Sequence, residues 1–292
     1  MTDQLRRHES QGMLRIAVPN KGSLAETAAQ MLWEAGYTGR RDPRDLHTAD
    51  PRNGVEFFYL RPRDIATYVG SGALDVGITG RDLLLDSGAK AEEVRRLGFG
   101  RSRFRFAARP GTLASLDDLA GKRIATSYVG VVRRHLEERG IDAEVVRLDG
   151  AVETSIQLGV ADVIADVVET GSTLRQAGLE VFGETILDSE AVLVTRGGSV
   201  PSGFEVFKRR LDGVLVARTY VMMDYDIPED RLEEGVALTP GLEGPTMSPL
   251  HREGWMAVRA MVPRDGAQKL MDDLYEIGAR AILLTDIHAC RL

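Results

Sequence analysis

Short apolar runs alternate along most of this sequence with longer stretches whose apolar residues recur at helical spacing. The runs at 14–18, 55–60 and 75–79 are each followed by such a stretch. A strand that leads into a helix and then into another strand is the repeating unit of an α/β protein with largely parallel sheets. Further strands are expected at 123–127, 144–148 and 162–165. This alternation therefore predicts an α/β fold.

The order of the elements also indicates how the chain divides. Its 292 residues are enough for two or three domains of about 100–200 residues. The stretch 99–110 is irregular and basic, which suits a crossing between two lobes, and a strand at 191–195 can return the chain to the first lobe. The expected parts are a disordered tail at 1–12, a first lobe at 13–103 and 189–203, and a second lobe at 104–188.

A glycine-rich linker at 197–203 precedes a change in the pattern. A helix is expected at 204–218, and the later elements follow the order strand, helix, strand, strand, helix, strand. This order is the ferredoxin-like unit. The sequence therefore predicts a third part, an α+β domain over 204–292, although a fold alone does not establish a role.

The composition excludes several classes of protein. Hydrophobic residues make up 43% and charged residues 28% of the chain, the balance of a globular protein. The net charge of −7 argues against binding to nucleic acid. A single cysteine, Cys290, forms no intramolecular disulfide, and the longest stretch without charged residues, 65–74, is too short to cross a membrane. The tail has no signal-peptide pattern, so we expect a cytoplasmic protein without a membrane partner.

Three turns that follow strands of the first lobe carry residues suited to binding anions. Lys21 and Gly22 precede a helix whose start is fixed by a Ser-x-x-Glu capping box, Arg61 begins an Arg-Pro-Arg turn, and Gly80 ends the third strand. A helix N-terminus offers free N–H groups and a positive dipole end. Each turn alone is equally consistent with an ordinary connection that carries solvent-exposed cations. Together they predict a phosphate-binding edge, because ligands of open α/β sheets bind at the carboxyl ends of strands.

The strongest local motif follows an apolar strand of the second lobe. The strand ends at Asp166, and a second carboxylate follows at Glu169. The next helix is opened by Thr170, Gly171, Ser172 and Thr173. Hydroxyls and N–H groups at a helix start can hold a phosphate, and the carboxylates can hold ribose hydroxyls or a Mg²⁺ bound by substrate oxygens. The motif favours a phosphoribosyl-binding loop, with a simple helix cap as the alternative.

Other common catalytic patterns are missing from the sequence. The five histidines are scattered singly without metal-ligand spacing, and there is no Gly-x-Ser-x-Gly elbow, no Walker A motif and no complete Gly-x-Gly-x-x-Gly. A structural metal site, a hydrolase triad and a dinucleotide fingerprint therefore have no support.

In the order of these motifs, the sequence resembles the ATP phosphoribosyltransferases of the long, histidine-regulated form. The resemblance runs from about residue 13 to the C-terminus. It rests on 18–22, 60–64, 75–80, 123–128, 162–174, 223–226 and 240–243. It implies two lobes like those of type II periplasmic binding proteins, a catalytic cleft between them and a ferredoxin-like regulatory domain. The implied reaction moves the phosphoribosyl group of phosphoribosyl pyrophosphate to N1 of ATP and releases pyrophosphate. This is the first step of histidine biosynthesis, catalysed by a pentosyltransferase with Mg²⁺.

The resemblance also implies roles for the residues of the predicted edges. Because N1 of ATP is the nucleophile, the protein needs no covalent nucleophile and must supply orientation and charge stabilisation. Lys21 and Arg61, with Mg²⁺ held mainly by substrate phosphates, are expected to neutralise the pyrophosphate or the ATP phosphates. Gly22 and Gly80 are expected to line the substrates. The loop 170–173 is expected to hold the 5′-phosphate, with Asp166 and Glu169 at the ribose; no protein ligand of the metal is assigned.

The resemblance further places a histidine-binding effector pocket in the C-terminal domain. The matching positions are Asp226, Leu242, Thr246 and Ala281, and Gly244 stands where some relatives have serine. The implied protein is inhibited by histidine and assembles as a homo-oligomer, from dimer to hexamer. Two alternatives stay open at this point: a two-lobed sensor without catalysis, and a phosphoribosyltransferase with a different acceptor.

Overall fold

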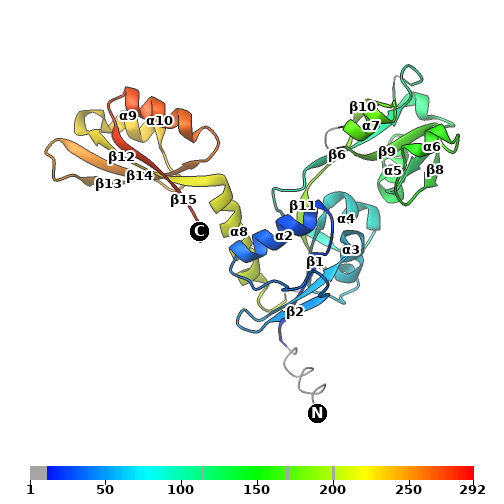
Figure 1. The fold of residues 1–292 in the computed structure, drawn as a ribbon, viewed down its shortest axis with the longest axis horizontal. Helices are drawn as coiled ribbons and strands as arrows, with labels where there is room; N and C mark the ends of the chain where they lie inside the picture. The colour runs from blue at the N-terminus through cyan, green and yellow to red at the C-terminus, as the bar shows by residue number, and fades with distance from the viewer. Residues whose placement is uncertain (1–11, 114, 169–170, 199–200) are drawn as a thin grey trace, which may run out of the picture. The chain divides into compact units, whose positions relative to one another are not determined.

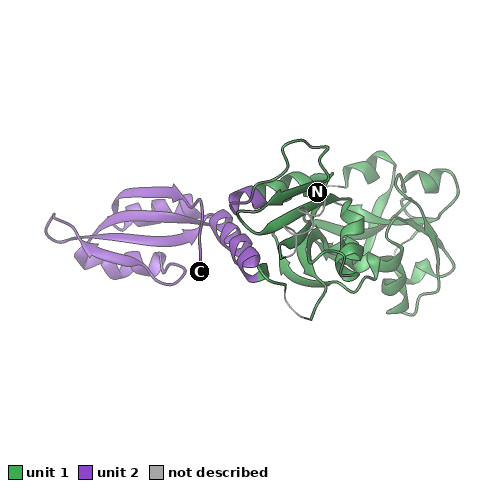
Figure 2. Cartoon of the chain, turned by 90° about the horizontal axis from the view of Figure 1, so that it is seen from below, with its two compact units in different colours: residues 1–30, 38–204 green, residues 31–37, 205–292 purple. Residues whose placement is uncertain are grey.

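The computed structural model describes residues 12–113, 115–168, 171–198 and 201–292. The tail predicted at 1–12 therefore lies, apart from Gly12, outside the described residues. The chain forms two compact units (Figure 2). Unit 1 comprises residues 1–30 and 38–204, and unit 2 comprises residues 31–37 and 205–292. None of the described helices is long and apolar enough to cross a membrane.

Unit 1 contains two sheets, and we call the parts built on them lobe I and lobe II (Figure 1). The sheet of lobe I has the order β2-β3-β1-β4-β11-β5. Its strands are β1 (Leu14–Pro19), β2 (His47–Asp50), β3 (Val55–Leu60), β4 (Val76–Gly80), β5 (Glu92–Arg96) and β11 (Ala191–Thr195). Strands β3, β1 and β4 run parallel, and β11 lies antiparallel to both of its neighbours. The connecting helices are α2 (Ser23–Glu34), α3 (Pro62–Gly70) and α4 (Arg81–Ser87).

The four central strands of lobe I, β3, β1, β4 and β11, are nearly continuous apolar runs because both faces of the sheet are covered there. Ile16 and Val18 of β1 are fully buried. Helix α3 begins with Pro62 at its first position, where the missing N–H costs nothing. It packs closely on β4: a Cβ added at Gly77 would lie 2.5 Å from Cγ2 of Ile65. A glycine is therefore required there, and the close contact fixes the turn that leads into α3.

Lobe II is built on a second sheet of order β10-β6-β9-β7-β8. Its strands are β6 (Ser102–Ala108), β7 (Arg123–Thr126), β8 (Glu144–Arg147), β9 (Val163–Val168) and β10 (Glu180–Ser189). Its helical segments are η1 (Asp117–Leu119), α5 (Val129–Glu137), α6 (Thr154–Gln157) and α7 (Ser172–Gln176). Phe104 and Phe106 of β6 pack with Ile124 and Val132 in the core of this lobe.

Both lobes share one strand order. Three parallel strands in the order second, first, third are followed by an antiparallel strand that enters from the other lobe, which is β11 in lobe I and β6 in lobe II. This is the arrangement of type II periplasmic binding proteins, so the predicted fold class is confirmed. The expectation that 99–110 is irregular was wrong for 102–108, which form β6. Here Phe104 and Phe106 are buried in the core while Arg103 and Arg105 are more exposed, a two-residue period typical of a strand.

Unit 2 carries an antiparallel sheet of order β13-β14-β12-β15. Its elements are α8 (Phe204–Thr219), β12 (Tyr220–Pro228), η2 (Glu229–Arg231), α9 (Leu232–Leu238), β13 (Thr246–Pro249), β14 (Trp255–Pro263), α10 (Ala267–Glu276) and β15 (Arg280–Asp286). This strand order and the strand–helix–strand–strand–helix–strand sequence make the predicted ferredoxin-like unit. Alternate residues of β12, such as Met223 and Tyr225, are buried in one core with Leu274 of α10.

Candidate active site

The phosphate-binding turns predicted in lobe I follow three neighbouring parallel strands. Strand β1 is in register with β3 from Leu14 opposite Val55 to Pro19 opposite Leu60, and the other neighbour of β1 is β4. The N–H of Asn20 donates to the carbonyl of Leu60 at 2.8 Å, which ties the ends of β1 and β3 together. The structure thus brings Lys21, Arg61 and Gly80 to one edge of the sheet, where Lys21 and Arg61 are exposed to solvent.

Glycines shape two of these turns. Gly22 has a φ of 78° in the left-handed region, and nothing lies within 4 Å of the position of a Cβ there, so the backbone is open to a ligand. Gly80 is buried at the end of β4 and precedes α4. A Cβ at Gly80 would collide with the carboxylate of Asp82. Gly22 therefore leaves its turn open to a ligand, whereas the missing side chain at Gly80 makes room for the Asp82 carboxylate.

Asp82 itself joins lobe I to the strand that returns from lobe II. Its N–H donates to Oγ of Ser189 at 3.0 Å, and the Ser189 hydroxyl donates to Oδ1 of Asp82 at 2.9 Å. Both residues are buried. This reciprocal pair fixes a carboxylate directly beyond the Gly80 turn, a residue that the sequence analysis did not select.

Asp166 lies near the end of β9 in lobe II, where its N-terminal neighbours in the strand are buried. Its Oδ1 accepts a hydrogen bond from the N–H of Val167 at 2.7 Å. Burial raises the pKa of the Asp166 carboxyl to about 6, and the charges of Glu153 and Asp82 raise it as well. The Asp82 and Asp166 carboxylates, one from each lobe, are thus close enough to repel each other.

Tyr128 completes this group of side chains. It precedes the first residue of α5 in lobe II, and its ring lies 4.8 Å below the guanidinium of Arg63 from lobe I. Burial raises the pKa of the Tyr128 phenol, and the charges of Asp82 and Asp166 raise it further. We call Arg63, Asp82 and Asp86 of lobe I, with Tyr128, Gly130 and Asp166 of lobe II, the lobe junction.

The signals for the lobe junction were partly visible in the sequence. Arg63 and Asp82 stand in the predicted strand-to-helix turns. Tyr128 follows β7 at the equivalent place in lobe II. These residues meet because the two lobes are in contact, and such a long-range contact cannot be predicted from the local spacing of residues.

The predicted phosphate loop is described only in part. Glu169 and Thr170 lie outside the described residues. Gly171 has a φ of 70° and precedes α7, and Ser172 and Thr173 form the exposed start of that helix. The left-handed φ favours glycine at 171. The hydroxyls of Ser172 and Thr173 are therefore presented at a surface-exposed turn directly beyond β9.

Asp166 is the carboxylate of the lobe junction best placed to help hold a divalent cation, because Asp82 is hydrogen-bonded by Ser189 and Asp86 by Arg63 and Gly130. Among residues outside the masked segments, no group of three or more His, Cys, Asp or Glu side chains is placed to hold a metal ion. A Mg²⁺ held mainly by substrate oxygens could take a further ligand from Asp166, because carboxylate and phosphate oxygens are its usual ligands. A cation beside Asp166 would also favour the ionised form of that carboxyl.

The predicted effector residues lie on and around the sheet of unit 2. Asp226 on β12 faces away from the helix-covered core, because its strand neighbours Tyr225 and Ile227 are buried. Thr246 on β13 lies opposite the exposed Arg259 of β14, which in turn pairs with Asp224, so it belongs to the same face. Ala281 has a φ of 49° on β15, at an irregularity in the pairing beside Asp226. Leu242 is exposed in the loop before β13.

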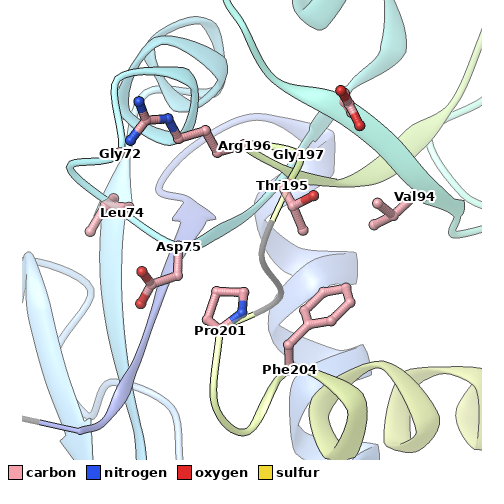
Figure 3. A pocket seen from close by; sticks show the side chains of 11 residues that line it. Gly72, Leu74, Asp75, Val94, Thr195, Arg196, Gly197, Pro201 and Phe204 are labelled. Atoms are coloured by element: carbon pink, nitrogen blue, oxygen red, sulfur yellow. The ribbon is translucent and has the colours of Figure 1, made fainter.

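A cavity of about 690 Å³ lies elsewhere in unit 1 (Figure 3). Its lining includes Asp75, Thr195 and Arg196, which stand at the start of β4 and at the end of the antiparallel β11. It therefore opens at the edge of the sheet opposite Lys21. The carboxylate of Asp75 is occupied by the N–H of Arg15 at 2.8 Å. This cavity is thus separate from the substrate edge.

Fold and site together are those of a two-lobed phosphoribosyltransferase, with exposed cations at the strand ends of one lobe and a carboxylate beside a hydroxyl-bearing turn in the other. The family model described as "ATP phosphoribosyltransferase" matches residues 61–213, and the model of the HisG C-terminal domain matches residues 217–289. The chain therefore belongs to the ATP phosphoribosyltransferase family, and the second match makes it a member of the long form.

Known relatives agree with this assignment. Curated ATP phosphoribosyltransferases from Streptomyces avermitilis and Streptomyces coelicolor are each 67% identical to this chain over 285 residues, which is 96% of this chain and 100% of theirs. A chain of the ATP phosphoribosyl transferase (HisG:HisZ) complex from Thermotoga maritima is 28% identical, with a TM-score of 0.59, and covers 70% of this chain and 98% of its own length.

The comparisons decide between the alternatives that the sequence left open. The protein is a pentosyltransferase that moves the phosphoribosyl group of phosphoribosyl pyrophosphate to N1 of ATP, the first step of histidine biosynthesis. The sensor without catalysis and the transferase with another acceptor are both set aside.

Proposed function

We propose that Lys21 and Arg61 stabilise the pyrophosphate that leaves in this reaction. The bond from C1 of the ribose to the pyrophosphate oxygen breaks while N1 of ATP bonds to C1, so negative charge builds up on the leaving group. Two exposed cations at the carboxyl edge of one sheet support this role, because fixed positive charge is most useful where charge develops. The open backbone at Gly22 gives phosphate oxygens access to this edge, while Gly80 leaves room for the carboxylate of Asp82 at the end of β4.

The donor sugar belongs, in this proposal, to lobe II. Asp166 and Glu169 accept hydrogen bonds from the ribose hydroxyls, while Thr170, Gly171, Ser172 and Thr173 hold the 5′-phosphate. The position of Asp166 near the end of β9, with Ser172 and Thr173 exposed just beyond it, supports this assignment. Mg²⁺ would be bound mainly by substrate phosphates, with Asp166 as an available carboxylate, and it would supply further charge neutralisation.

Replacement of the two cations tests the pyrophosphate assignment. Lys21→Ala and Arg61→Ala should each lower turnover by about 10²–10³, the usual cost of losing one donor to a developing charge. Turnover is read as pyrophosphate released from ATP and phosphoribosyl pyrophosphate. Lys269→Ala, which removes a solvent-exposed cation on α10, serves as the control. Near-normal turnover in both test variants would show the assignment to be wrong.

We also propose that the parts of the chain divide the work. Residues 13–103 with 189–203, and residues 104–188, act as the two catalytic lobes, and 204–292 act as a regulatory domain that binds histidine at Asp226, Leu242, Thr246 and Ala281. Asp226 and Thr246 lie on the surface of the sheet that points away from the core. This position supports an effector site shared with another copy of the chain. The protein would act in the cytoplasm as a dimer or a hexamer. Light scattering with and without histidine measures the mass of the assembly and so tests its size.

A further inference from the structure

The carboxylate of Asp86 joins the two lobes. Asp86 lies near the end of α4 in lobe I, with its side chain 11% exposed. Its Oδ1 accepts hydrogen bonds from the N–H of Gly130 at 2.7 Å and of Val131 at 3.3 Å, both in the first turn of α5 in lobe II. Its Oδ2 pairs with Nη1 of Arg63 at 2.7 Å. One carboxylate thus caps a helix of one lobe while it holds an arginine of the other.

The backbones of the two helices approach closely at the same point. A Cβ added at Gly130 would lie 2.5 Å from the backbone carbonyl oxygen of Asp86. One turn further along α5, Nη2 of Arg134 donates to the carbonyl of Leu85 at 3.1 Å. Gly130 is therefore needed for the contact, and the two lobes meet here through several bonds that involve both backbones.

The second arm of Asp86 directs Arg63 toward the substrate side of the lobe junction. With Nη1 held by Asp86, the guanidinium of Arg63 stacks over Tyr128 at 4.8 Å from the ring centre. From there its charge lowers the pKa of the Asp166 carboxyl, in opposition to burial. Arg63 is partly exposed, so without Asp86 its long side chain would be free to turn toward solvent.

We propose that Asp86 is a positioning residue for phosphoribosyl transfer, which fixes the two lobes in register and holds Arg63 beside Asp166. The reaction needs groups on both lobes at one ribose carbon, and a displacement of about 1 Å between them costs about 100-fold in rate. Asp86 acts through Arg63 and through the start of α5, without touching substrate. This role rests on the proposed assignment of substrate groups to both lobes, and its test changes Asp86, Arg63 and Gly130 while Lys21 and Arg61 stay in place.

A double-mutant cycle with Arg63 tests the bond between Asp86 and Arg63. Asp86→Asn keeps an oxygen for the N–H of Gly130 but loses the charge that holds Arg63. We expect Asp86→Asn and Arg63→Gln each to lower kcat about tenfold or more. The double variant should be no slower than the slower single variant, because both changes remove one interaction. If Asp86 had only a structural role, its replacement would lower the melting temperature. The kcat of the folded molecules would then show no such coupling between Asp86 and Arg63.

Asp162 offers a matched control for Asp86. Its carboxylate also accepts a backbone N–H, from Arg123 at 3.0 Å, and pairs with the guanidinium of that arginine at 2.9 Å. Both partners lie within lobe II, at the amino ends of β7 and β9 and thus away from the substrate edge. Asp162→Asn should leave kcat within twofold of the wild type.

Gly130→Ala tests the close approach of the helices without removing a polar group, and it keeps the proposal testable if Asp86→Asn does not fold. We expect kcat to fall at least fivefold, with α-helix content by circular dichroism unchanged. The proposal is overturned if Gly130→Ala or Asp86→Asn turns over within twofold of the wild type. It is also overturned if the losses of Asp86→Asn and Arg63→Gln multiply in the double variant.

Discussion

Replacing Asp166 with asparagine should make the protein more stable at neutral pH, because burial disfavours the ionised Asp166 carboxylate, which therefore destabilises the fold. Burial raises the pKa of the Asp166 carboxyl from 3.8 to about 6. The folded state therefore binds a proton more tightly than the unfolded state, and stability falls as the pH rises through this window. At 1.36 kcal/mol per pKa unit, the full penalty above the window is about 3 kcal/mol.

The wild type and Asp166→Asn should differ in free energy of unfolding by an amount that depends on pH, and this dependence isolates the effect of the Asp166 charge. Asp166→Asn keeps an oxygen for the N–H of Val167 and cannot ionise. The variant should gain about 3 kcal/mol at pH 8 and only about 1 kcal/mol at pH 4.5. For a domain of this size these values correspond to about 6–12 °C and about 2–4 °C in melting temperature. Thermal unfolding followed by circular dichroism across this pH range measures both.

Asp162→Asn provides a control of opposite sign. Hydrogen bonds from Arg123 hold the pKa of the Asp162 carboxyl below its usual range. That carboxylate therefore stabilises the fold at neutral pH, and the variant should melt below the wild type at pH 8, with the difference fading in acid. The reasoning is refuted if the Asp166→Asn difference does not change between pH 4.5 and 8, or if it grows as the pH falls.

Four further outcomes can be checked directly. Gly77→Ala should destabilise the protein by about 1–3 kcal/mol in thermal unfolding, since the added methyl meets Ile65 in a packed core. Ser172→Ala and Thr173→Val should each raise the KM for phosphoribosyl pyrophosphate about tenfold and leave the KM for ATP unchanged, as expected for lost hydrogen bonds to a charged phosphate. Asp226→Ala should raise the histidine concentration that halves turnover by about tenfold or more, and unaltered inhibition would remove Asp226 from the effector site. Chelation by EDTA should abolish pyrophosphate release, and added Mg²⁺ should restore it.

Much of the fold was predictable because its strands and helices have clear periods. The apolar run of β1 and the capping box of α2 define their elements locally. Strand β5 was missed because Glu92–Arg96 is almost entirely charged. It is held in place by its ladder with β11, a strand about one hundred residues away, so the pairing and not the composition makes it a strand.

The substrate edge was predictable for a different reason. The rule that ligands bind at the carboxyl ends of parallel strands places Lys21, Arg61 and Gly80 together without any knowledge of side-chain contacts. The bonds that join the lobes could not be foreseen in this way. Asp86 and Gly130 are 44 positions apart and belong to helices of different lobes, and an aspartate before Ser-Gly at a helix end has the composition of any helix terminus.

The exchange of strands between the lobes has a consequence for synthesis on the ribosome. Strand β11 lies between β4 and β5, yet its last residue, Thr195, is made 115 positions after Gly80. At about 5–20 residues per second, synthesis of these 115 residues takes roughly 6–23 seconds, during which β4 lacks its neighbour β11. Lobe II, whose strands run without interruption from Ser102 to Ser189, can complete its sheet first. We expect the emerging chain to acquire protease resistance in lobe II before lobe I.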